Sequence, residues 1–321
     1  MTDELQPVTE QLQAESGELQ PPGEPLFDPG APLRPSGNLR RREIVGRLGT
    51  GICTAAAVLA VAVLGIVIFT VAKRGASAIS LNFLIKPASL FGGPSGGIGP
   101  ELVGTIVLVA LAAALATPVG ILTALFVTEF ARGRPAQIVR AVLDLMQGLP
   151  SIIVGVLVFS LLVAGTGESG YAGSIALAII MLPLIARAAQ EVILLVPTSL
   201  REAADSLGVN RWRTITGVVL PEARAGIVTG IILAVARAAG ETAPLILIDG
   251  VFNPSQFSWN PFVGNHAIPN IPVEIFTLSE QADPSSFTRA WGAALVLLAM
   301  ILFANFVARL ILARSARKLG R

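Results

Sequence analysis

Residues 202–221, Glu-Ala-Ala-Asp-Ser-Leu-Gly-Val-Asn-Arg-Trp-Arg-Thr-Ile-Thr-Gly-Val-Val-Leu-Pro, interrupt a series of long apolar segments and yet are not composed like a loop. Ser199, followed three residues later by Glu202, is a capping box, which predicts that a helix begins there. Gly208 suits the left-handed position just past a helix end, and Asn210 can cap a second short helix. The sequence therefore predicts two short helices joined at a glycine.

The second helix should not continue simply beyond Pro221, which lacks a backbone N–H group. We call residues 198–221 the elbow. It lies between two apolar segments, so we expect it at a membrane face. An amphipathic helix resting on the lipid surface is the alternative, which Trp212 between Arg211 and Arg213 would also suit.

The composition is that of a polytopic, all-α membrane protein. Hydrophobic residues make up 53% of the 321 residues and charged residues only 14%, and the apolar residues come in long runs. Cys53 is the only cysteine, so no internal disulfide is possible, and the single histidine, His266, excludes a multi-histidine metal site. No feature indicates nucleic-acid binding; the bilayer is the expected surrounding.

Six membrane-spanning helices are predicted from runs of about twenty apolar residues. The third should kink at Gly148-Leu149-Pro150. The predicted spans cover residues 49–72, 102–130, 139–164, 171–187, 225–248 and 290–312.

Residues 1–47 are predicted to form a disordered tail, because their Pro, Glu, Gln and Gly residues bury too little surface to offset ordering entropy. Residues 48–321 form the transmembrane domain. The glycine-rich segment 90–100 should be a flexible entry to the second span. Residues 249–289 are predicted to be a long external loop, either a partner surface or a stiff connector.

The distribution of lysine and arginine predicts the orientation in a prokaryotic cell membrane. If the amino terminus is inside, most basic residues are cytoplasmic, and only four remain outside: Lys73, Arg74, Lys86 and Arg289. Both termini and the elbow should then face the cytoplasm. Glu129 and Asp144 can reach that interface and are interpreted as boundary residues.

The fifth span carries two charges, Arg237 and Glu241, about midway along it, where an ionised group costs several kcal/mol unless it is paired or solvated. A spacing of four places both on one helix face. They border a seam of small residues suited to close contact with another helix: Gly226, Gly230, Ala234, Ala238 and Thr242.

Pro244 leaves the carbonyl of Gly240 without its helical partner, so the fifth span should break where it lines a wet cavity. Arg237 offers a planar fork of donors that suits tetrahedral oxyanions, with Glu241 moderating its charge. We expect both residues in a transport pathway, with Pro150, Gly240 and Pro244 as kink or gating positions. A structural ion pair that joins helices is the alternative.

The elbow resembles the loop signature of binding-protein-dependent ABC transporter permeases: Glu-Ala-Ala, three residues, Gly, nine residues, an aliphatic, one residue, Leu-Pro. The matching positions are Glu202, Ala203, Ala204, Gly208, Leu220 and Pro221, with Val218 where the family usually has isoleucine. The resemblance implies a type I ABC importer permease fold, in which the elbow is a cytoplasmic coupling helix that docks on a separate ATPase.

Three stretches look like the phosphate-specific permeases: Gly-Gly-Ile-Gly-Pro-Glu-Leu-Val-Gly-Thr (96–105), Gly-Leu-Pro-Ser-Ile (148–152) and Ala-Arg-Ala-Ala-Gly-Glu-Thr-Ala-Pro-Leu (236–245). Ile-Pro-Val-Glu-Ile-Phe (271–276) favours the PstA type over its paralogue PstC. The resemblance implies import of inorganic phosphate and three partners: a PstC-like permease, a PstB-like ATPase dimer and an external phosphate-binding protein. Arg237 and Glu241 match the intramembrane charged positions in this family's phosphate path.

No stretch matches Gly-x-x-x-x-Gly-Lys-Ser/Thr, the phosphate-cradling loop of ATPases, so the chain is expected to be no enzyme and to bind no cofactor. ATP would be used by the partner ATPase. Two alternatives stay open for the function: a permease for another oxyanion such as sulfate, and an ion-coupled secondary transporter that uses the Arg237–Glu241 pair. A membrane scaffold without transport is a third class.

Overall fold

The structure is a computed structural model that describes residues 37–88, 96–165, 167, 169–250 and 267–318, with side chains from 40 to 310. Every regular element in these ranges is helical. The predictions for the first 36 residues, for 89–95 in the glycine-rich segment and for 251–266 in the long loop lie outside the described residues.

The first helix, α2 (Gly37–Gly75), is longer than predicted. It begins at Gly37, so residues 37–47 are helical rather than part of an unstructured tail. No proline follows Pro35 in this segment, and an i,i+4 ion pair between Arg47 and Glu43 adds a few tenths of a kcal/mol. The chain divides within α2 into two compact units, residues 1–65 and 66–321. The helical part of the first unit exposes its apolar side chains, among them Leu59 and Val61.

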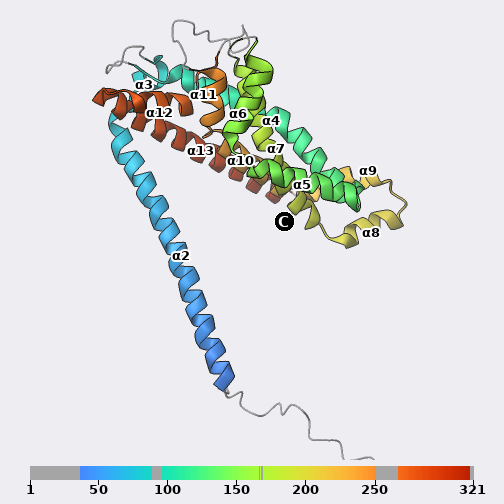
Figure 1. Cartoon of the computed structure of the whole chain (residues 1–321). Helices are drawn as coiled ribbons and strands as arrows, with labels where there is room; N and C mark the ends of the chain where they lie inside the picture. Colours follow the sequence, from blue (N-terminus) through green and yellow to red (C-terminus); the bar gives the residue numbers. More distant parts are fainter. Residues whose placement is uncertain (1–36, 89–95, 166, 168, 251–266, 319–321) are drawn as a thin grey trace, which may run out of the picture. The chain divides into compact units, whose positions relative to one another are not determined.

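Five described helices are long and apolar enough to cross a membrane, and a bent helix pair makes six when it is counted as one span (Figure 1). The five are Arg40–Ala78, Gly99–Phe130, Gly170–Leu194, Arg211–Ala238 and Pro284–Leu310. The all-helical, polytopic fold predicted from the apolar runs is therefore confirmed.

The bent pair consists of α5 (Arg134–Gly148) and α6 (Ser151–Val158), the latter extended by a π-helical turn to Val163. The two parts meet at 97°, far more than a kink. Leu149 has extended backbone angles (φ −70°, ψ 132°), because the residue before a proline is pushed away from the helical region. Pro150 therefore turns the chain instead of merely bending a helix.

The core of the second unit is built on α7 (Gly170–Leu194), which packs along both α4 (Gly99–Leu125) and α10 (Leu220–Ala238). α7 extends beyond the predicted end at Arg187. The seam on α10 faces α7 of the same chain: a Cβ atom added at Gly230 would lie 2.4 Å from the Ala188 Cβ atom. Small residues thus allow close helix contact, as predicted.

The fifth predicted span is divided in two. α10 ends at Ala238, and α11 (Ala243–Asp249) begins after a short non-helical stretch around Gly240. Pro244 stands in the first turn of α11, where its missing N–H group costs nothing. A Cβ atom added at Gly155 would lie 2.7 Å from the Pro244 Cα atom, so α6 and α11 touch at this point.

The predicted long loop 249–289 is partly helical. Asn270 accepts a hydrogen bond from the Val273 N–H group and so caps α12 (Ile271–Glu280), and α13 (Pro284–Lys318) begins before the predicted start at 290. The Ile271 N–H group donates to the Thr105 hydroxyl (2.9 Å) in the first turns of α4. This anchors α12 at the end of α4 opposite the elbow. The short α3 (Leu81–Ile85) packs at the same end.

Candidate functional site

The first arm of the elbow is α8 (Thr198–Ser206). The capping box predicted at Ser199 and Glu202 is wrong, since the helix starts one residue before Ser199 and makes no side-chain cap hydrogen bond. Pro197 stands at the N-cap position instead, with φ −55° and ψ 136°. The proline ring fixes this φ, so the start of the helix does not depend on a capping side chain.

Gly208 ends α8 as predicted. Its φ of +68° lies in the left-handed region, and no atom lies within 4 Å of an added Cβ, so the need for glycine here is conformational. The Val209 N–H group donates to the Ala204 carbonyl (3.1 Å) and the Gly208 N–H group to the Asp205 carbonyl (2.9 Å), the two bonds of a Schellman motif.

The second arm begins at Asn210, whose side chain accepts a hydrogen bond from the Trp212 N–H group (3.0 Å), so the predicted cap is confirmed. The prediction for Pro221 is wrong. α9 (Arg211–Thr214) runs through a π-helical segment, Ile215–Val219, directly into α10. The Leu220 N–H group bonds back to the Ile215 carbonyl, and this i→i+5 pattern accommodates the proline without a break.

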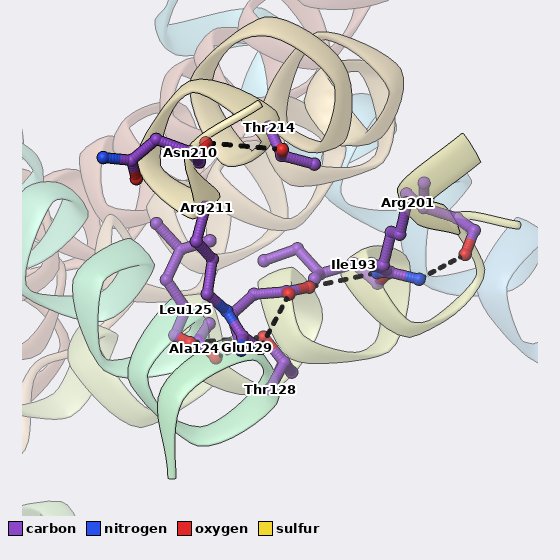
Figure 2. A network of polar contacts seen from close by, with 10 residues as sticks. Ala124, Leu125, Thr128, Glu129, Ile193, Arg201, Asn210, Arg211 and Thr214 are labelled. Atoms are coloured by element: carbon purple, nitrogen blue, oxygen red, sulfur yellow. Dashed lines mark hydrogen bonds and ion pairs between the residues drawn. The ribbon is translucent and has the colours of Figure 1, made fainter. Parts of the chain in front are cut away.

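Glu129 holds both arms of the elbow (Figure 2). It lies at the end of the second span, in the π-helical segment Phe126–Phe130, and is only 8% exposed. One carboxylate oxygen accepts from Arg201 on α8 (3.1 Å), and the other is 3.7 Å from Arg211 on α9. A single buried carboxylate thus connects α8, α9 and the end of the second span.

Arg201 also caps α7. It donates to the carbonyl of Ile193 (2.9 Å) in the last turn of α7 and to that of Val196 (2.7 Å), two residues past the end of the helix. On the other arm, Arg211 lies over the Phe130 ring (5.6 Å), which in turn contacts the Trp212 ring (5.5 Å). The elbow is therefore held against the ends of two spanning helices.

These contacts were not predicted from the sequence, which indicated only that Glu129 and Asp144 are boundary residues at the cytoplasmic interface. Glu129 is buried in the network, and Asp144 on α5 pairs with Arg187 on α7, which also donates to the Arg140 carbonyl (3.1 Å). The available signal was charge complementarity: an acidic residue at a helix end, close to an elbow rich in arginine. Which arginine it meets depends on the fold alone.

The signature residues divide into exposed and buried positions. Glu202, Ala203, Gly208 and Pro221 are exposed, Leu220 is half-buried and Ala204 is buried (8% exposed). Beside Gly208, the Leu207 side chain is 82% exposed. The turn between the two arms therefore presents an apolar tip with a carboxylate on one flank, while Ala204 faces the body of the protein.

Arg237 and Glu241 form an ion pair, with 3.7 Å between the Arg237 Nε and a Glu241 carboxylate oxygen. The prediction that both share one helix face is wrong, because α10 ends at Ala238 and Glu241 lies in the non-helical stretch beyond it. The arginine side chain is 61% exposed and the glutamate side chain 16%. Arg237 also lines a pocket of about 230 Å³ at the bend between α5 and α6. The other lining residues are Met146, Gln147, Leu149, Pro150, Ser151, Val154, Ile179, Ile180 and Leu184.

This pocket combines one cation with neutral hydrogen-bonding groups. Gln147 is held by a hydrogen bond from its Nε2 atom to the Pro183 carbonyl (3.2 Å), and Ser151 begins α6. The pocket exists because Pro150 turns the chain and because α10 ends just beyond Arg237. Such a set of donors can bind an anion without enclosing it, since the guanidinium stays largely exposed.

Solved ABC transporter structures have the same fold. The chain superposes on a bacterial alginate ABC transporter, solved with an alginate-bound periplasmic protein, with a TM-score of 0.59 at 17% identity over 86% of this chain and 98% of the other. It superposes on the inward-facing methionine transporter MetNI with a TM-score of 0.54 at 20% identity over 68% of this chain and 94% of the other. These similarities concern the fold alone.

Residues 116–321 match the family described as "Binding-protein-dependent transport system inner membrane component". Two relatives are the phosphate transport system permease protein PstA 1 of Mycobacterium tuberculosis (38% identical, 68% of this chain, 71% of the relative) and PstA of Haemophilus influenzae (34%, 76% and 85%). PstA of Xylella fastidiosa is 34% identical over 86% of this chain and 95% of its own length. The chain therefore belongs to the family of binding-protein-dependent transport system inner membrane components and is of the PstA type, as its sequence predicts.

Proposed function

We propose that this chain is the membrane-spanning subunit of an ATP-driven importer for inorganic phosphate. The observation that carries the proposal is the elbow, an exposed turn whose two arms are held by the buried Glu129 carboxylate. The names of its relatives, phosphate transport system permease proteins, support inorganic phosphate as the substrate. The fold, which is that of ABC transporters, supports ATP hydrolysis as the energy source.

The partners follow from this assignment. A PstB-like ATPase dimer would bind and hydrolyse ATP, so this chain needs no cofactor of its own. A PstC-like permease would form the other half of the pathway, and an external binding protein would deliver phosphate. The lysine and arginine bias supports an elbow and both termini in the cytoplasm, where ATP is available.

Coupling would proceed from the elbow to the spans. Closure of the ATPase dimer pushes the turn at Gly208. The Arg201–Glu129 contact transmits the displacement to the second span, and the Arg201 bonds to the Ile193 and Val196 carbonyls transmit it to α7. Because α4 and α7 pack along their length, the two helices move together.

In the pathway, Arg237 would attract phosphate into the pocket beside Gln147 and Ser151. Glu241 reduces the net charge, so the anion is attracted but not trapped. The breaks at Pro150 and around Gly240, with Pro244 beyond, would allow the pocket to change shape as the helices move. Gln147, Pro150, Ser151 and Arg237 line the same pocket, and Pro244 touches Gly155 of α6.

The coupling assignment is tested with Glu202→Ala and Gly208→Val in the reconstituted complex. Phosphate uptake should be lost, while ATP binding by the isolated ATPase is kept. The matched control is Asp205→Asn, an exposed acidic position on the same helix, which should leave uptake near wild type. Normal uptake in both test variants would disprove the role of the elbow.

The pathway assignment is tested with Arg237→Gln. Uptake should fall while the complex still assembles, whereas loss of assembly would favour a structural ion pair. Competition with sulfate during phosphate uptake separates the two oxyanions. Uptake that survives ATP depletion but stops when the proton gradient is dissipated would identify an ion-coupled transporter instead.

A further inference from the structure

A second polar pocket, of about 430 Å³, lies at the end of the bundle opposite the elbow. It is bounded by the turn after α2, by α3 and by the first turns of α13. The lining residues are Ser77, Ala78, Ser80, Asn82, Phe83, Lys86, Gly96, Ser285, Thr288 and Arg289. None of them carries a carboxylate, two are cations and five bear a hydroxyl or an amide group.

The two cations differ in their surroundings. Lys86 is exposed, and its ammonium group donates to no side chain that the structure describes. Arg289 is only 4% exposed, and its guanidinium lies 4.0 Å from the Glu274 carboxylate. The pocket therefore has one exposed cation, Lys86, and one buried cation, Arg289.

Glu274 is an acidic neighbour of Arg289. Burial raises the pKa of Glu274 to about 7, against the opposing effect of Arg289, so this carboxyl ionises less readily than an ordinary glutamate. Glu101, in the first turn of α4, is 1% exposed and belongs to the same cluster. Glu101 and Glu274 both lie close to Arg289, and neither lines the pocket.

The hydroxyl groups are mostly engaged in local structure. Ser80 caps α3 by accepting from the Phe83 N–H group (3.1 Å), and the Thr288 hydroxyl donates to the Pro284 carbonyl (3.1 Å). Ser285 donates to the Asp283 carboxylate, and that bond lowers the pKa of Asp283, so a carboxylate stands beside one lining residue of the pocket. Within the described residues, the Asn82 amide has no such partner. Asn82, Lys86 and Arg289 thus give the pocket its amide group and its two cations.

Aromatic and basic side chains lie beside this pocket. The Arg74 guanidinium lies over the Trp291 ring (5.1 Å), and Phe287 packs edge-on against Trp291 (6.2 Å). Aromatic and basic side chains gather where the hydrocarbon meets water. A ligand here can come from either phase.

We propose that this pocket binds a phosphate group through Lys86, Asn82 and Arg289, at a site separate from the one that contains Arg237. The group is either free inorganic phosphate or the headgroup of an anionic phospholipid, since both present the same tetrahedral oxyanion. A lysine at the rim and an arginine fork in the wall match this chemistry.

The experiment uses the full chain with Arg237→Gln as background, so that the first pocket does not contribute. Binding of ³²P-labelled inorganic phosphate is measured by equilibrium dialysis in detergent, and retention of phosphatidylglycerol by native mass spectrometry. Lys86→Gln should weaken binding about tenfold in at least one of the two measurements, the value of a lost charged hydrogen bond. Asn82→Ala should weaken the same binding severalfold.

The matched control is Lys73→Gln, an exposed lysine at the same end of α2 that does not line the pocket. It should change binding by less than about twofold. If Lys86→Gln weakens only the binding of phosphate in the dialysis, the ligand is free phosphate. If it weakens only the retention of phosphatidylglycerol, the ligand is a lipid headgroup. Either result supports the proposal. Equal losses in Lys73→Gln and Lys86→Gln, or no dependence on Lys86 in either measurement, would overturn it.

Discussion

Replacing Glu129 with glutamine tests whether the elbow is held by one buried charge. The amide has the same shape and keeps one acceptor oxygen, but it removes the negative charge between Arg201 and Arg211. Arg201 still donates to the Ile193 and Val196 carbonyls, so α7 stays capped. The change therefore weakens the connection between the elbow and the second span without deleting a side chain.

The expected cost follows from the geometry. Arg201 and Glu129 are 22% and 8% exposed at 3.1 Å, so the loss is that of a charged hydrogen bond, about 1.5–3 kcal/mol. It stays below the 3–5 kcal/mol of a fully buried broken pair, since glutamine still accepts. Arg211 lies at 3.7 Å and is 52% exposed, so water screens it and its share is below about 1 kcal/mol. The sum is about 2 kcal/mol.

Amide hydrogen exchange measures this loss where it occurs. A local destabilisation of about 2 kcal/mol should speed exchange in residues 198–214 by about thirtyfold, with little change in α4 and α10. Phosphate uptake should fall in the same variant. The matched control, Asp144→Asn, removes an acid that is 62% exposed and pairs elsewhere, and it should leave elbow exchange unchanged. Wild-type exchange and wild-type uptake in Glu129→Gln would show that the Glu129 carboxylate does not hold the elbow.

Three further predictions concern single positions. Gly208→Ala places a Cβ at φ +68° and should destabilise the turn by about 1–2 kcal/mol, seen as faster exchange at Val209, whereas Gly217→Ala, which meets no atom within 4 Å, should not. Gly230→Val forces a side chain against Ala188, 2.4 Å from the new Cβ, and should lower the melting temperature of the purified protein; Gly46→Val, with open space, is the control. The folded-state pKa of Glu274 lies above its ordinary 4.5, so the folded protein binds the extra proton and stability should fall as pH rises from about 4.5 to 7, by up to about 3 kcal/mol. Glu274→Gln mimics the protonated form and should flatten this dependence, and equal pH profiles for both proteins would contradict the shift.

The number of spans, the elbow and the family could all be predicted from short segments of the sequence. The number of spans follows from the length of the apolar runs, because a bilayer imposes one length on every crossing helix. The elbow follows from Gly208 and Asn210, since a left-handed residue and a cap are properties of short segments. The family follows from the same stretch, in which the Glu-Ala-Ala and Leu-Pro positions stand at fixed spacing.

Other features were decided only by packing. Pro221 lies within a continuous helix, because the π-helical segment before it accommodates the missing N–H group. At Pro150, in contrast, the chain turns by 97° where the sequence predicts a kink. The same residue type thus had opposite outcomes, each set by the helices around it. The partners of Glu129 lie 72 and 82 positions away in the chain, and no local pattern selects them. A buried ion pair forms only where the packing of whole helices brings two charged side chains together. The sequence therefore shows which residues are charged, and only the tertiary structure shows which of them pair.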